Sequence, residues 1–412
     1  MEYEQRVDRS GSAGPAVAEL TGLEGPFVFP EKLLQQIWLH REFDLARAVT
    51  NDGRRVGVRS PGRWNLLGGP DFRDARLELG GTPLLGDVEV HVRATDWRAH
   101  GHQHDPAYRS VVLHVVLFPS SELTTAGWED APIPILTVLP LLLHDLEEYA
   151  ADAAVAALAN RPSVQIVEWL GALPTERRLE RLRGCALARW RQKVRFARLR
   201  LDRLGWREAC HQSALEILGY RFNRVPMIRI AAAFPLPVWA GRGIDPDALV
   251  AAEQEHWALQ GVRPANQPRA RLRQYARWCA AVPDWPERLY AWGQSMAMER
   301  PGNDDADTSR FRRAAHLPQL RSALAETIVG GAVTGSRLDT LVCDGFLPLL
   351  AAADVAADVG HSLWWHWYEG DVPDYLRRGL RDLALAGDAR APACHGLTQG
   401  LIGGLLARET VR

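Results

Sequence analysis

Two acidic side chains and one histidine recur at a spacing that can build a divalent-metal site. Asp71 follows a Gly-Gly-Pro turn, while Glu89 and His91 stand two apart in the run 87–93. Polar and valine side chains alternate in that run, so a β-strand there would project Glu89 and His91 from one face. Residues 72–79 alternate in the same way and precede a Gly-Gly turn. The pattern predicts a hairpin that returns Glu89 to the side of Asp71.

This arrangement predicts a defined chemistry. Carboxylate oxygens suit hard cations, so Asp71 and Glu89 are expected to bind Mg²⁺ or Mn²⁺. Because this pattern resembles that of the PD-(D/E)XK nucleases, His91 is expected to position or deprotonate a water molecule for attack on a phosphodiester, with the ion lowering the pKa of that water. Arg93 or Arg63 is expected to hold a phosphate group, because a guanidinium makes forked contacts with phosphate oxygens.

A cluster of histidines follows the second predicted strand. Five of the thirteen histidines fall within 24 residues: His91, His100, His102, His104 and His114. Histidine is the commonest neutral metal ligand, so the cluster keeps open an alternative in which a transition metal serves a hydrolase. His100 and His102 are the preferred candidates in the loop. His114 lies in the apolar strand predicted at 110–118, where a hydrogen-bonded core histidine is expected.

The Asp and Glu-x-basic pattern on adjacent strands resembles the PD-(D/E)XK nuclease superfamily. The resemblance implies a restriction-endonuclease-like mixed sheet in an α/β domain, with Asp71 and Glu89 as metal ligands. His91 stands where that superfamily usually has lysine. Two further interpretations stay open: a non-catalytic scaffold that keeps this fold, and a solvent-facing strand with ordinary charges.

A closer resemblance covers nearly the whole chain. The motifs that carry it are Asn65-x-x-Gly-Gly-Pro-Asp71-Phe72, Gly86-x-Val-Glu89-Val-His91, Asp96-Trp97-x-x-His100-Gly101-His102 with Tyr108, Asn223-Arg224-x-Pro226 and Gln399-Gly400-Leu401. Together they resemble a bacterial family known as domain of unknown function 2851. The resemblance implies supporting roles for Asn65, Asp96, His100, His102 and Tyr108. It implies no activity, so the nuclease hypothesis depends on the predicted metal site.

Composition limits the function classes. The 412 residues are 47% hydrophobic and 24% charged, which is typical of a soluble globular protein of two or three domains. The net charge of −1 gives no global nucleic-acid signal. Five scattered cysteines without close pairs indicate reduced thiols and a cytoplasmic location. No signal peptide or membrane span is expected, and P-loop, serine-esterase and zincin motifs are absent from the sequence.

The spacing at which hydrophobic residues recur changes along the chain, from a mixture of strand and helix patterns to mainly helix patterns. We expect a flexible arm at residues 1–25, an α/β domain at 26–160 and an all-α domain at 161–412. The α/β domain should open with a helix from Glu31 to about Ala48. In the second part, helical periodicity dominates, with predicted helices at 175–204 and 206–218 among others. The tryptophans, including Trp364, Trp365 and Trp367, are expected to fill helical cores.

The predicted helix at 176–204 is strongly basic. Between Arg177 and Arg207, twelve Arg or Lys residues face only two acids. Apolar residues recur three or four apart, so one stripe should be buried while most arginines surround it. Arg191, Arg195 and Arg198 are therefore candidates for binding nucleic-acid phosphates. The alternative is an ordinary solvated face. The sequence carries no signal of oligomeric state.

Overall fold

A computed structural model gives the fold of the chain. It describes residues 31–65, 68–143, 148–149, 170–241, 243–254, 256–259, 262, 264–298, 307–355, 357–386 and 392–409. The chain divides into two compact units, residues 1–143 with 407–412 and residues 144–406. The division comes earlier than the boundary predicted near residue 160. The predicted arm at 1–25 and the predicted domain boundary near 160 lie outside the described residues.

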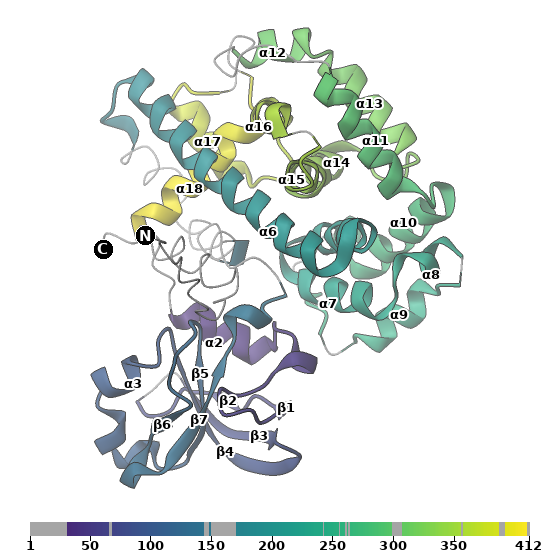
Figure 1. The fold of residues 1–412 in the computed structure, drawn as a ribbon. Helices are drawn as coiled ribbons and strands as arrows, with labels where there is room; N and C mark the ends of the chain where they lie inside the picture. The colour runs from purple at the N-terminus through teal and green to yellow at the C-terminus, as the bar shows by residue number, and fades with distance from the viewer. Residues whose placement is uncertain are drawn as a thin grey trace, which may run out of the picture. The chain divides into compact units, whose positions relative to one another are not determined.

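The first unit contains a mixed seven-stranded sheet (Figure 1). Its strands are β1 (Val56–Ser60), β2 (Arg63–Trp64), β3 (Phe72–Leu79), β4 (Thr82–His91), β5 (Val111–Val116), β6 (Thr124–Ala126) and β7 (Pro132–Thr137). The order is β1-β3-β4-β5-β7-β6, with β2 paired to β3. The pairs β1/β3, β3/β4 and β6/β7 are antiparallel, whereas β4/β5 and β5/β7 are parallel.

The predicted strands form where the alternation is strongest. The strand expected at 72–79 is β3, and Gly80-Gly81 makes the turn into β4. Both glycines have positive φ, which a side chain would disfavour. Val88, Val90, Leu113 and Val115 are fully buried in β4 and β5. These central strands are covered on both faces, which explains the nearly continuous apolar run of β5.

Short helices connect the strands. Helix α2 (Glu31–His40) precedes the sheet and buries Leu34, Ile37 and Trp38. It ends well before Ala48, the predicted end, and a 3₁₀ turn at Leu45–Arg47 follows. Between β4 and β5, the crossover contains α3 (Asp96–Ala99) and two 3₁₀ turns, His102–His104 and Pro106–Tyr108.

The second unit is helical in its described part (Figure 1). Its helices are α6 (Thr175–Leu218), α7 (Tyr220–Ala233), α8 (Leu236–Ala240), α9 (Pro246–Ala252), α10 (Pro268–Ala281), α11 (Trp285–Met298), α12 (Thr308–Ala314), α13 (Leu317–Thr327), α14 (Gly335–Thr340), a π-helix (Leu341–Phe346), α15 (Leu347–Ala352), α16 (Ala357–His366), α17 (Asp374–Asp382) and α18 (His395–Glu409). Within the described residues, no helix has the length and apolar character needed to cross a membrane.

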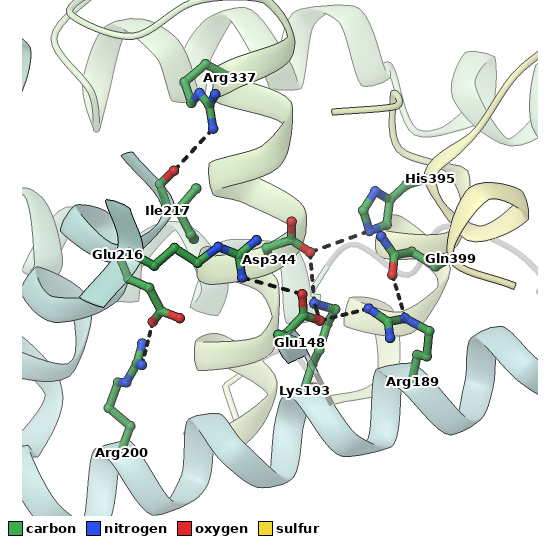
Figure 2. Close-up of polar contacts among 11 residues, drawn as sticks. Glu148, Arg189, Lys193, Arg200, Glu216, Ile217, Arg337, Asp344, His395 and Gln399 are labelled. Atoms are coloured by element: carbon green, nitrogen blue, oxygen red, sulfur yellow. Dashed lines mark hydrogen bonds and ion pairs between the residues drawn. The ribbon is translucent and has the colours of Figure 1, made fainter. Parts of the chain in front are cut away.

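Helix α6 runs through both helices predicted at 175–204 and 206–218. Gly205 interrupts it with φ 71° and ψ 171°, which is why two helical patterns meet there. The basic face differs from the prediction, because Arg189, Lys193 and Arg200 are buried. Each of the three pairs with an acidic side chain of the same unit (Figure 2). A charged side chain can be buried when it is paired in this way.

The tryptophans fill the helical core as predicted. Trp364 and Trp367 are fully buried, and Trp365 is nearly so. They belong to one continuous apolar cluster with Trp278 and Trp285. Base stacking by these indole rings is therefore ruled out.

Candidate metal centre

The hairpin of β3 and β4 brings Asp71 and Glu89 together. Phe72 pairs with Val88, so the residue before β3 lies opposite Glu89. The Asp71 backbone N–H donates to Glu89 Oε2 at 2.9 Å, and the Val90 N–H donates to Asp71 Oδ2 at 3.2 Å. These reciprocal bonds fix both carboxylates at the same end of the hairpin.

Two histidines approach the Glu89 carboxylate, and a third approaches one of them. Glu89 Oε1 lies 3.5 Å from His91 Nε2 and 3.4 Å from His102 Nε2. His100 Nδ1 lies 3.2 Å from His91 Nε2. One ligand atom from each of His91, His100 and His102 lies within 4.8 Å of the others. The structure therefore brings together Glu89, His91, His100 and His102. His100 and His104 are both exposed, but His104 lies outside the histidine group.

These separations fit a shared cation. Ligand atoms that bind one ion at roughly 2.0–2.2 Å in a tetrahedral arrangement lie roughly 3.3–3.6 Å apart. The three separations around Glu89 and His91, 3.2 to 3.5 Å, are close to that spacing. His102 Nε2 is also buried without a hydrogen-bond partner among the described residues. A buried polar atom of this kind is explained if it binds an ion.

The crossover loop fixes the directions of its histidines by packing. Trp97 is fully buried, and its ring meets the rings of His91 and His102 edge-on. The Tyr108 ring stacks on His102 with 3.9 Å between ring centroids. Gly101 adopts φ 76°, which allows the sharp turn between α3 and the 3₁₀ turn that carries His102. These contacts turn His102 toward Glu89.

A second layer of hydrogen bonds orients His91. His91 Nδ1 lies 2.9 Å from His114 Nε2, and His114 Nδ1 lies 2.7 Å from Thr125 Oγ1. If both histidines carry the proton on Nδ1, each donates along this chain and His91 Nε2 keeps its lone pair for the cluster. His114 is fully buried, so the prediction of a hydrogen-bonded core histidine is confirmed.

We expect Thr125→Val to lower the Mn²⁺ affinity of the centre about tenfold. The substitution removes the acceptor at the end of the chain, and outer-layer partners of metal-bound histidines typically contribute 10- to 100-fold to affinity. Isothermal titration calorimetry measures the effect, with Thr124→Val on the same strand as the matched control. Equal affinities for the two variants would show that the chain does not position His91.

Helix α2 adds two residues that sequence reasoning missed. Gln35 Nε2 donates to Asp71 Oδ1 at 2.7 Å, and Glu31 Oε1 lies 3.9 Å from His91 Nε2. The two are four positions apart and therefore lie on one face of the helix. The four-residue spacing of Glu31 and Gln35 is the signal in the sequence that could have indicated them. It identifies a shared face but not the part of the sheet that the face meets.

Burial shifts the acid–base chemistry of the centre. Burial and the charge of Glu89 raise the pKa of Asp71 to about 7, and burial raises the pKa of Glu89 to about 8. Burial, followed by the charges of His114, His102 and His100, lowers the pKa of His91 to about 2. At neutral pH without a cation, Glu89 therefore keeps a proton and the His91 imidazole is neutral, and a bound cation would favour release of the Glu89 proton.

The remaining predicted residues stabilise loops. Asn65 Nδ2 donates to the carbonyls of Gly68 and Pro70, in the turn before Asp71. Asp96 Oδ2 accepts from the Arg93 backbone N–H at 2.8 Å. The exposed Arg93 guanidinium lies over the Phe118 ring. Among the predicted phosphate-binding residues of this unit, Arg63 forms an exposed ion pair with Asp74.

The candidate nucleic-acid residues belong to the second unit. Arg191 and Arg195 are exposed on α6. Arg198 pairs with Asp354 Oδ2 at 2.7 Å, and both side chains are substantially exposed. Exposed pairs of this kind contribute little to stability, so Arg198 can exchange Asp354 for a phosphate.

Comparison with known proteins gives one family. The profile of the family described as "Protein of unknown function (DUF2851)" matches residues 31–249, more than half of the chain. The matched region includes the whole candidate metal centre and all of α6. No curated protein and no solved structure matches the chain.

Proposed function

Because the chain belongs to the DUF2851 family, whose description names no activity, its function has to be inferred from the site, and we propose a metal-dependent nuclease. The observation that carries the proposal is the meeting of Asp71 with Glu89 and His91 at one end of the β3/β4 hairpin. This is the constellation that the PD-(D/E)XK resemblance implies.

The order of elements supports the same reaction class. Helix α2 is followed by the antiparallel strands β1, β3 and β4, then by a crossover and the parallel strand β5. A restriction-endonuclease-like core is proposed on this order. Fold alone does not establish chemistry, so the proposal depends on the side chains at the end of β4.

The donor set favours a transition metal over Mg²⁺. Imidazole nitrogens suit Zn²⁺, and Mn²⁺ suits carboxylate oxygens such as those of Glu89 and Asp71, whereas Mg²⁺ prefers oxygen ligands and water. Glu89, His91, His100 and His102 would hold the ion, with Asp71 beside them. A bound divalent ion would supply positive charge that stabilises the negative charge developing on a scissile phosphate.

The chain's own residues then have separate roles. His91 points its Nε2 into the cluster and acts as a ligand in this proposal. Because its Nδ1 bonds to His114, no ring nitrogen is left for the water-activating role expected from its position in the motif. Glu31 is more exposed than Glu89, with side-chain exposures of 38% and 6%. Its pKa is raised by burial and by the charge of Asp71. Glu31 is therefore the carboxylate best placed to accept a proton from an attacking water.

A cleavage panel tests the proposal. The full chain is stripped of metal with a chelator and supplied in turn with Mn²⁺, Zn²⁺, Mg²⁺ and Ca²⁺, using single- and double-stranded DNA and RNA as substrates. Cleavage is expected with Mn²⁺ or Zn²⁺. We expect His102→Ala to lower both metal affinity and rate at least about 100-fold, because it removes a ligand. His104→Ala, an exposed residue of the same loop, should match the wild type.

Two other outcomes correspond to the alternatives. A chain that binds no divalent ion and cuts no substrate would be a scaffold that keeps the fold. A chain that binds Zn²⁺ tightly at the three histidines but hydrolyses only other esters would be a transition-metal hydrolase, an alternative favoured by the nitrogen-rich cluster. Either result would contradict the nuclease proposal.

A further inference from the structure

The proposed metal centre offers more protein ligands than a catalytic ion usually keeps. Four side chains are proposed to hold the ion: Glu89, His91, His100 and His102. Four protein ligands complete a tetrahedral site, whereas catalytic zinc sites keep three and leave the fourth position to water or substrate. A centre that acts on a substrate therefore has to release one of the four side chains.

Glu89 and His91 are fixed by buried hydrogen bonds. Their exposed fractions are 4% and 1%. Glu89 Oε2 accepts from the Asp71 backbone N–H at 2.9 Å, and His91 Nδ1 lies 2.9 Å from His114 Nε2. Both residues belong to β4, which lies between β3 and β5 in the sheet. Neither side chain can leave the ion without breaking a hydrogen bond in the interior, which is unfavourable.

His102 is fixed by two aromatic rings. It is 8% exposed. The Tyr108 ring stacks on it, and the ring of the fully buried Trp97 meets it edge-on with 5.3 Å between centroids. Rings packed in this way hold a side chain in one rotamer, because rotation would open a void in the core. His102 is therefore a permanent member of the ligand set.

His100 lacks such support. It is exposed, and it follows the last residue of the four-residue helix α3. Its ring contacts the rings of His91 and His102 edge-on. Among the described residues, its ring nitrogens make one polar contact, between Nδ1 and His91 Nε2 at 3.2 Å. The contacts that hold the His100 ring therefore come from the other ligands and not from the surrounding protein.

The chain beside His100 leaves room for the ring to move. Gly101 has φ 76°, and apart from its chain neighbours nothing lies within 4 Å of a Cβ at this position. Trp97 anchors α3 in the core, so the backbone can stay in place while the side chain rotates. Exposed side chains change rotamer within nanoseconds. Rotation of His100 into solvent would leave the three buried ligands undisturbed.

We propose that His100 is the exchangeable ligand of the metal centre: it binds the ion while no substrate is present and gives up its position to a substrate oxygen. Glu89, His91 and His102 are then the permanent ligands. Two histidines and one glutamate form one of the ligand sets that hold catalytic zinc. This inference rests on the metal-dependent function proposed above, and it adds the residue that opens the site.

Two affinities of a His100→Ala variant should change by the same factor. Closure by His100 strengthens binding of the ion and weakens binding of an oxyanion, which can bind only the open form. We expect His100→Ala to lower the affinity for Co²⁺ roughly 3- to 10-fold and to raise the affinity of the Co²⁺-loaded chain for inorganic phosphate by the same factor. The factor is small because water replaces an exposed ligand at little cost.

Calorimetry of the full chain measures both affinities. The visible absorption of Co²⁺ reports which ligands surround the ion, since it depends on coordination geometry. Without phosphate, the spectra of the wild type and His100→Ala should differ. With phosphate bound they should become alike, because His100 has left the ion in both. His102→Ala is the comparison for a permanent ligand, and His104→Ala, an exposed residue of the same loop, should match the wild type.

The possible failures can be told apart. A loss of Co²⁺ affinity as large as that of His102→Ala would make His100 a permanent ligand, and an unchanged affinity would remove it from the ligand set. Either result, or a phosphate affinity that does not rise, contradicts the exchangeable ligand. A wild-type chain that binds no Co²⁺ would overturn the metal centre itself. Neither measurement uses cleavage, so an absence of nuclease activity would not by itself affect this result.

Discussion

Replacing Glu89 with glutamine is expected to lower Mn²⁺ affinity at least about 100-fold and to reduce cleavage below detection. Glu89 Oε1 lies within 3.5 Å of two histidine ligand atoms, so its charge is central to the cluster. Glutamine keeps the shape and can still accept the Asp71 N–H bond, which limits the change to the charge. Calorimetry with Mn²⁺ and cleavage of the panel substrates measure the two effects. Retained affinity would remove Glu89 from the ligand set.

The same substitution should stabilise the metal-free protein at alkaline pH. The pKa of Glu89 is raised from 4.5 to about 8, so the folded state holds a proton that the unfolded state releases. The resulting stability is complete below pH 4.5 and is lost as the pH rises toward 8. We expect Glu89→Gln to remove roughly 4 kcal/mol of this loss in urea unfolding at pH 8. Glu78→Gln, at a more exposed site on β3, should behave like the wild type.

Gly400→Ala should destabilise the helical unit by about 3 kcal/mol. A Cβ at Gly400 in α18 would lie 2.3 Å from the carbonyl oxygen of Leu182 in α6 and 2.9 Å from its carbonyl carbon. Both atoms are backbone, so the two helices must separate. The melting temperature is expected to fall by roughly 5–10 °C, measured by circular dichroism.

Gly184→Ala on α6 is the control for this result. Nothing lies within 4 Å of a Cβ at Gly184, so alanine there should stabilise the helix by up to about 1 kcal/mol. If Gly400→Ala were equally harmless, the close approach of α6 and α18 would be incorrect. The contact also explains why glycine stands beside Gln399, whose side chain accepts a hydrogen bond from Arg189.

Local pattern was sufficient to predict the central part of the sheet. The alternation at 72–79 and 87–93 identified β3 and β4, and the Gly-Gly turn set their register. That register brings Glu89 to Asp71, since hairpin pairing is determined by neighbouring residues. The pattern did not identify β6 and β7, which are short and contain threonine or proline in place of a long alternating run.

The local sequence pattern did not predict contacts between residues that are far apart in the chain. Glu31 reaches His91 only because α2 docks on the sheet, and the directions of His100 and His102 depend on the packing of Trp97. On α6, Lys193 appeared to belong to a solvated basic face. Its acidic partner Asp344 comes from a helix about 150 residues later, so no periodicity within α6 could indicate burial.

The candidate metal centre brings together the two ends of a chain segment. His91 ends β4 in the interior of the sheet, whereas His100 and His102 belong to the crossover that leads to β5. An ion held by all three would act as a cross-link that closes a short loop and restricts the unfolded chain. All five cysteines are free thiols, so the protein has no disulfide to do this. Unlike a disulfide, such a cross-link can be removed by a chelator without any change in redox state, which would make the order of the crossover depend on metal supply.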